Sequence, residues 1–119
     1  MLLGVDESLG RLVATLDSLG ALDSTIIVLT SDHGYFYGEH GLDQERRLAY
    51  EETARIPLIV RYPRVARAGT TPSQMVQTID FASTLLSMAG VRDTVARQGV
   101  SLVPVLDGSA TTWRTSVFL

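Results

Sequence analysis

The feature that most constrains the fold is an apolar run, TIIVLT, which spans residues 25–30 and is followed at once by Ser-Asp-His-Gly. The run has no polar alternation and is rich in β-branched side chains, a pattern typical of a strand that is buried on both faces. Such strands occur in parallel sheets whose two faces are covered by helices. The run therefore predicts an α/β fold, with a mostly parallel sheet flanked by helices.

The segment before this run has apolar residues at steps of three and four, which predicts a helix that ends at Gly20. These residues are Val5, Leu9, Leu12, Val13, Leu16 and Leu19. We expect a second strand over residues 57–62, with Pro57 at its start because proline cannot donate to a sheet ladder. A second helix is expected over residues 79–89, with Thr78 or Asp80 as its N-cap.

The parts between these elements are predicted to be less regular. Residues 31–49 are rich in glycine and charge, which indicates a loop with one helical turn. The helix over residues 79–89 should turn Phe81, Leu85, Met88 and Ala89 toward the sheet. Pro104 should keep the apolar segment GVSLVPVLDG from forming a regular strand.

Composition limits the possible partners. The chain has 119 residues, about the size of one domain, and a net charge of −3, which gives no electrostatic reason to expect a nucleic acid or an anionic membrane as partner. It has no cysteine, so disulfides, thiolate metal sites and a cysteine nucleophile are excluded within these residues. No apolar run approaches the roughly 20 residues of a transmembrane helix.

The residues that carry chemistry follow the first strand. In open α/β sheets, ligands bind beyond the carboxyl ends of the strands, which is where Asp32 and His33 fall. A carboxylate oxygen and an imidazole nitrogen are both good ligands for a divalent cation, and Gly34 would let the backbone turn sharply beside them. The alternative is an ordinary turn, in which His33 only satisfies Asp32.

Four blocks in order, "TIIVLTSDHGYFYGEHGL", "RRLAYEETARIPLIVRYP", "IDFASTLLSMAGV" and "GVSLVPVLDG", resemble the back half of the catalytic domain of sulfatases, in the alkaline-phosphatase-like group. The helix ahead of them also looks like the one that precedes the metal motif of that family. The resemblance covers nearly the whole chain and implies a sulfuric ester hydrolase. Its substrate would be a small-molecule or saccharide sulfate ester.

The resemblance also implies site residues. Asp32 and His33 would help to bind one divalent ion, calcium in most sulfatases, with Mg²⁺ or Mn²⁺ as alternatives because a histidine ligand suits calcium less well. His40 matches a position near the substrate pocket, for substrate contact or proton transfer, or else it only bonds locally. Arg46, or Arg47 if the loop is one residue longer, matches a sulfate-binding lysine, or the two are an exposed basic pair.

Two acidic residues are expected to be structural. Arg55 and Arg61 flank the second strand, and Glu51 and Glu52 are expected to pair with these arginines in an ion-pair network.

The nucleophile expected of a sulfatase, a formylglycine made from a C/S-x-P-x-R motif, is absent from these residues, as are the first two metal-binding Asp residues of the family. We therefore expect residues 1–119 to be a fragment of a sulfatase catalytic domain, truncated at both ends and inactive without its N-terminal half. The alternatives are a fragment of a related phosphodiesterase or phosphonate monoester hydrolase, or a non-catalytic α/β remnant.

Overall fold

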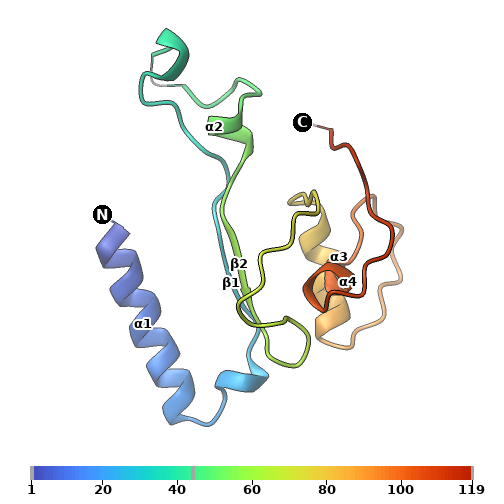
Figure 1. The fold of residues 1–119 in the computed structure, drawn as a ribbon. Helices are drawn as coiled ribbons and strands as arrows, with labels where there is room; N and C mark the ends of the chain where they lie inside the picture. Colours follow the sequence, from blue (N-terminus) through green and yellow to red (C-terminus); the bar gives the residue numbers. More distant parts are fainter. Residues whose placement is uncertain (1, 44, 119) are drawn as a thin grey trace.

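The computed structural model describes residues 2–43 and 45–118. In chain order, its elements are α1 (Leu2–Ser18), the 3₁₀ turn η1 (Leu22–Ser24), β1 (Ile27–Thr30), the 3₁₀ turn η2 (Glu39–Gly41), α2 (Glu51–Ala54), β2 (Leu58–Arg61), α3 (Asp80–Met88) and α4 (Val103–Leu106) (Figure 1). The sequence predicted both strands and the long helices at these places, with ends that differ by one or two residues.

The sheet differs from the prediction. β1 and β2 pair antiparallel, with Ile27 opposite Arg61 and Thr30 opposite Leu58, so a mostly parallel sheet is not confirmed. A parallel pair needs a crossover that returns the chain to its starting end, usually through a helix on the sheet. Here residues 31–57 instead turn back beyond the end of β1 as a long loop with only η2 and α2 in it (Figure 1). The chain therefore re-enters the sheet in the opposite direction.

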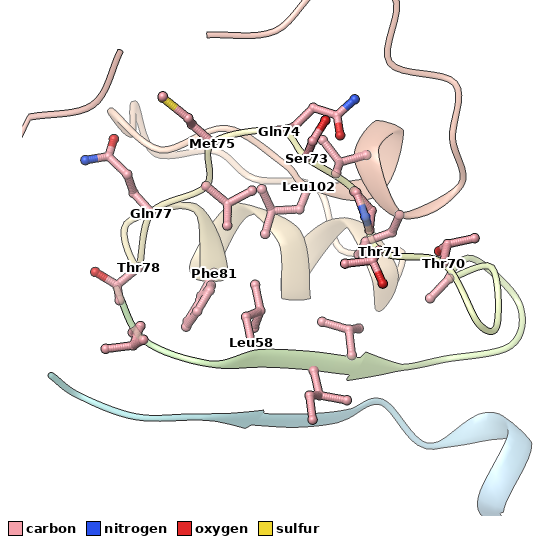
Figure 2. Close-up of a pocket in the computed structure, with 18 of the residues that line it drawn as sticks. Leu58, Thr70, Thr71, Ser73, Gln74, Met75, Gln77, Thr78, Phe81 and Leu102 are labelled. Carbon is pink, nitrogen blue, oxygen red and sulfur yellow. The ribbon is translucent and has the colours of Figure 1, made fainter. Parts of the chain in front are cut away.

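Helix α3 faces one side of this sheet across a small apolar space. Phe81, Leu85 and Met88 of α3 line a small apolar space together with Val28 and Leu58 of the strands. Figure 2 shows the side chains of Phe81 and Leu58 pointing toward one another. The prediction for α3 is confirmed at these three positions.

Two expectations about burial are wrong. Ala89 is exposed, because it follows the end of α3 instead of lying on its inner face. β1 is half-buried and alternates along its length, with Val28 38 % exposed, so it is not covered on both faces by the described residues.

Helix α1 stands apart from the sheet (Figure 1). It is helical where the sequence predicted, yet none of its residues is buried. Among the described residues, η1 is the one element that it contacts. Arg61 holds η1 to the sheet, because its guanidinium donates to the Leu22 carbonyl at 2.8 Å and to the Asp23 carboxylate at 2.6 Å. The polar contacts of β2 therefore fix the start of the first strand, while the apolar face of α1 stays open.

The start of α3 is the best-buried polar part of the chain. Asp80 is completely buried, and its carboxylate accepts hydrogen bonds from the backbone N–H groups of Gln77 (2.9 Å) and Val100 (3.0 Å) and from Arg114 (2.8 Å). Thr84 donates to the Asp80 carbonyl and accepts from the Leu102 N–H. These bonds tie the C-terminal segment to α3.

The N-cap of α3 differs from the one that the sequence predicted. The N-cap of α3 is Ile79, without a side-chain cap, and neither Thr78 nor Asp80 fills that role. Asp80 lies inside the helix, where its carboxylate reaches back to the preceding turn and across to the next segment. A cap and a buried bridging aspartate look alike in sequence, because both place an acidic residue at a helix start.

Helix α4 confirms that the GVSLVPVLDG segment is not a strand. Pro104 lies in its first turn, where the missing N–H costs nothing because no partner is available there. Val105 of α4 and Leu102 before it are buried. None of the helices in the described part of the chain is long and apolar enough to cross a lipid bilayer.

Candidate functional site

The Asp-His-Gly motif lies immediately beyond the end of β1, as the sequence predicted. The Asp32 side chain is 84 % exposed, and its Oδ1 accepts a hydrogen bond from the His33 backbone N–H at 3.0 Å. This bond, followed by the charge of the His33 ring and a contact from Ser31, holds the pKa of Asp32 below its ordinary value. Asp32 is therefore kept as an ionised carboxylate, which is the form that binds a cation.

The ring of His33 has a defined tautomer. Its Nδ1 lies 2.7 Å from the carbonyl oxygen of Gly34, and a carbonyl can only accept, so Nδ1 carries the hydrogen. In the neutral ring, Nε2 then presents a lone pair, and it lies 3.5 Å from Oδ2 of Asp32. Both atoms can therefore donate a lone pair to one cation.

This arrangement fits a divalent metal ion. Histidine ligands of metals commonly donate their other ring N–H to a carbonyl, as His33 does to Gly34. Ligand atoms at about 2.0–2.6 Å from one ion are about 3 Å or more apart, which is compatible with the separation of the two donor atoms. Within residues 2–43 and 45–118, no three Asp, Glu, His or Cys side chains cluster as a metal site. Asp32 and His33 can thus supply two ligands of a larger set.

Helix α2 clamps the backbone of this motif. The Gly34 N–H donates to the Thr53 carbonyl at 2.9 Å, and a Cβ at position 34 would lie 1.9 Å from the Glu52 carbonyl oxygen. Only a glycine fits against this carbonyl without moving it. The sequence predicted Gly34 as a sharp turn; its tertiary role is this close approach to α2.

His40 lies in η2 with a left-handed backbone, at φ 60° and ψ 16°, which is uncommon for a residue other than glycine. Its ring centroid is 4.9 Å from that of Tyr50 and 6.1 Å from that of Phe36, which is completely buried. Its Nε2 lies 3.0 Å from Oε1 of Glu52. The His40 ring is therefore fixed on both its face and its edge, while 48 % of its side chain stays exposed.

The two arginines of the next loop differ. Arg47 makes two hydrogen bonds to the Glu45 carboxylate, from Nε at 2.9 Å and from Nη2 at 2.8 Å, and its charge is thereby paired. The guanidinium of Arg46 makes no hydrogen bond or ion pair within the described part of the chain. Between these two candidates, Arg46 is the one that is free to meet an anion. Arg46 has no hydrogen bond or ion pair to Asp32, His33 or His40.

A wide, open hollow of about 1540 Å³ lies between β2, α3 and residues 67–78. Figure 2 shows Thr71, Gln74 and Met75 along the segment that borders it. Of the four candidate residues, Asp32 alone lines this hollow. His33, His40 and Arg46 lie in loops outside this hollow.

Glu52 is the residue that the sequence misassigned. We expected it to pair with an arginine, as Glu51 does with Arg55 at 3.4 Å, but its carboxylate binds His40. Among the described residues, the second oxygen, Oε2, is buried without a hydrogen-bond partner. One feature of the sequence could have indicated the different partner of Glu52. Adjacent residues of a helix, such as 51 and 52, point in different directions, so the two carboxylates were not expected to share one set of arginines.

Comparison with known families matches residues 38–119 to the family described as N-sulphoglucosamine sulphohydrolase, C-terminal. The match takes in well over half of the chain, including His40, Arg46 and Glu52. The chain belongs to this sulfatase family. The sequence resemblance to sulfatases is confirmed.

Individual relatives agree with this family membership. The N-acetylglucosamine-6-O-sulfatase of Bacteroides thetaiotaomicron is 48 % identical over 119 residues, which are 98 % of this chain and 21 % of that protein. The sulfatase-family chain thus spans about a fifth of the length of this curated relative.

Solved structures share the fold. A protein in complex with its substrate D-glucosamine-2-N,6-O-disulfate is 48 % identical and superposes with a TM-score of 0.87, over 95 % of this chain and 23 % of the other. The phosphonate monoester hydrolase of Silicibacter pomeroyi is 34 % identical, with a TM-score of 0.84 over 92 % of this chain and 22 % of the other. The arrangement of α1, the two strands and α3 thus occurs inside larger hydrolases.

Proposed function

We propose that this chain forms part of a metal-dependent sulfatase, which hydrolyses a sulfate ester to an alcohol and inorganic sulfate. The substrate class that we favour is a glucosamine unit sulfated at its 6-hydroxyl. This choice is supported by the relative named N-acetylglucosamine-6-O-sulfatase and by the substrate bound in the similar solved structure. The observation that carries the proposal is the pair of donor atoms, Asp32 Oδ2 and His33 Nε2, 3.5 Å apart at the end of β1.

Asp32 and His33 would hold one divalent ion, with calcium as the first candidate and Mg²⁺ or Mn²⁺ as alternatives. When bound, such an ion would stabilise negative charge on the sulfate oxygens as the S–O bond breaks. The Gly34 carbonyl holds the His33 ring in the tautomer that leaves Nε2 free for this ion. Glu52 and Thr53 hold the Gly34 backbone in place.

Arg46 would bind the sulfate group. A guanidinium can donate two parallel hydrogen bonds to an oxyanion, and this one is not already engaged by a carboxylate. Since an arginine stays protonated, Arg46 would bind and orient the anion without transferring a proton. His40, which keeps about half of its side chain exposed, would contact the substrate or transfer a proton to it.

These residues form only a portion of a catalytic set. The 119 residues contain no C/S-x-P-x-R motif, so the nucleophile would come from a sulfatase segment other than this one. The described residues also offer only two clustered metal ligands. We therefore propose that the chain has no hydrolytic activity by itself and works together with the remainder of a sulfatase domain.

A chimera tests this proposal. The matching segment of the Bacteroides relative would be replaced by this chain, and sulfate release would be measured with 6-O-sulfated N-acetylglucosamine. We expect the chimera to hydrolyse the substrate in the presence of a divalent ion. The variant Asp32→Ala should lower kcat by more than about a hundredfold, since even groups that support a metal ligand are worth about 10–100-fold. Asp17→Ala, at an exposed position of α1, is the matched control and should retain activity.

Three results would count against the proposal. A folded chimera without activity would contradict the sulfatase role of this segment. Full turnover by the Asp32→Ala chimera would favour the alternative in which Asp32 and His33 are turn residues of a non-catalytic scaffold. Equal activity with and without a chelator would contradict the proposal that hydrolysis requires a divalent metal ion.

A phosphonate monoester hydrolase is the second candidate, because two solved enzymes of that kind share the fold at 34 % and 31 % identity. The same chimera should therefore also be assayed with a phenyl phosphonate monoester. A preference for the phosphonate over the sulfate would favour this second function. The higher identity to the glucosamine-disulfate complex, 48 %, favours the sulfate.

A further inference from the structure

Glu52 of α2 lies between the two loops of the candidate site. Its backbone carbonyl faces Gly34 so closely that a Cβ there would lie 1.9 Å away. Its side chain points to the other loop, where Oε1 is 3.0 Å from Nε2 of His40. One residue of α2 thus contacts both the Asp-His-Gly motif and the loop that carries His40.

The bond to Glu52 assigns the tautomer of the His40 ring. An ionised carboxylate only accepts hydrogen bonds, so Nε2 of His40 carries a hydrogen. Nδ1 is then the ring atom that is free to accept a proton or a hydrogen bond from a substrate. The Tyr50 ring lies against the His40 ring, with the two centroids 4.9 Å apart and the planes tilted by 34°, which favours the observed ring orientation.

Two features of the Glu52–His40 pair are unfavourable for the stability of the fold. Oε2 of Glu52 is buried, and among the described residues it has no partner. Buried polar atoms are nearly always hydrogen-bonded, because burial without a bond is unfavourable. His40 also holds a left-handed backbone that only glycine adopts at ease, between Gly38 and Gly41, which have positive φ as well. Such costs concentrate at functional sites.

We infer that Glu52 is a positioning residue, which orients the His40 ring, fixes its hydrogen on Nε2 and so presents Nδ1 to the substrate of the proposed sulfatase. The same residue keeps this ring in register with Asp32 and His33 through the Gly34 contact. The inference rests on the proposed function, since His40 matters only if a substrate reaches it. It adds a residue that acts through His40 and does not itself touch the substrate.

The first test is the ring of His40 in the 119-residue chain, observed by ¹⁵N NMR of the imidazole nitrogens. We expect the form with hydrogen on Nε2 to dominate, and Glu52→Ala to produce a mixture of both tautomers. Glu52→Gln should rescue the tautomer, because its amide oxygen can still accept from Nε2. Glu51→Ala is the matched control: it removes the neighbouring carboxylate of α2, which pairs with Arg55 and not with His40.

The second test repeats these variants in the chimera with the Bacteroides relative. Glu52→Ala should lower kcat by at least about tenfold, the low end for groups that orient a functional side chain, with KM changed less. Glu52→Gln should retain more activity than Glu52→Ala, and Glu51→Ala should match the unmodified chimera. Circular dichroism of each variant separates these effects from unfolding.

An unchanged His40 tautomer in Glu52→Ala would overturn the inference, and so would an unchanged kcat in an active chimera. If the unmodified chimera is itself inactive, the proposed function fails, whereas the NMR result on the chain still decides whether Glu52 positions His40.

Discussion

The carboxylate of Asp80 and the guanidinium of Arg114 form an ion pair at 2.8 Å, between residues that are 34 positions apart in sequence. Asp80 is fully buried, and its oxygens also accept from the N–H groups of Gln77 and Val100. Arg114 in turn donates to the Gln77 side chain at 3.0 Å. The C-terminal segment, which has no strand or helix after α4 in the described residues, is therefore held to α3 by polar contacts.

Removal of this carboxylate should destabilise the chain strongly. Asp80→Ala leaves Arg114 without its anion and two N–H groups without an acceptor, so we expect a loss of about 3–5 kcal/mol in the free energy of unfolding. Urea denaturation followed by circular dichroism measures this loss. Asp6→Ala, at an exposed position of α1, should stay within about 0.5 kcal/mol of the unmodified chain. Equal stability of both variants would show that the buried pair contributes little.

The same residue predicts an acid-sensitive stability. Burial by itself would raise the pKa of Asp80, but the hydrogen bonds from Arg114, Val100 and Gln77 outweigh burial and lower it below the ordinary value of 3.8. A group with a lowered pKa in the folded state stabilises fully above its ordinary pKa, and this contribution is lost as the pH falls through the folded value. At pH values below about 4, the urea concentration at the unfolding midpoint should therefore decrease. This decrease should be smaller in Asp80→Ala. Parallel pH profiles of the two chains would contradict this origin.

Gly34→Ala should separate the Asp-His-Gly motif from α2. The added methyl group would lie 1.9 Å from the Glu52 carbonyl oxygen, so one of the two backbones must move. We expect a loss of about 1–3 kcal/mol or more in the free energy of unfolding, the usual range for overpacking. Gly10→Ala is the control: it lies inside α1 with no atom within 4 Å of the new Cβ, and should stabilise by up to about 1 kcal/mol. A tolerated Gly34→Ala would mean that α2 does not clamp the motif.

Glu45 offers a direct test of the arginine assignment. Hydrogen bonds from the Arg47 side chain, then from the backbone N–H groups of Arg46 and Arg47, lower the pKa of Glu45 to about 2. Arg47→Gln should raise this pKa toward the ordinary 4.5, as measured by ¹³C NMR of the carboxyl carbon. Arg46→Gln keeps its backbone N–H and should leave the pKa nearly unchanged. If Arg46→Gln raised the pKa of Glu45 and Arg47→Gln did not, Arg47 and not Arg46 would be the arginine that is free to bind an anion.

Much of the local structure could be predicted from the sequence. The apolar period of residues 2–18 specifies α1, and the β-branched run specifies β1, because these patterns act within a few residues of the chain. The place of Asp32 and His33 beyond a strand end followed from the same pattern. The family membership rested on four short blocks, which keep their order in any fold that the chain adopts.

The pairing of distant residues could not be predicted in this way. Asp80 looked like a helix cap, and Glu52 looked like the partner of an arginine, because sequence spacing reports only neighbours along the chain. Only the tertiary structure brings Arg114 to Asp80 and His40 to Glu52.

The sequence by itself thus determined the two long helices, the two strands and the family, while the assignment of Asp32 and His33 as metal ligands stays a prediction. The tertiary structure decided that β1 and β2 run antiparallel, that Arg47 is paired while Arg46 is free, and that α2 joins the two loops of the candidate site. The physical reason is the range of the interactions. Hydrophobic period and turn chemistry act locally, whereas the partner of a carboxylate depends on which segments the fold brings within about 3 Å of it.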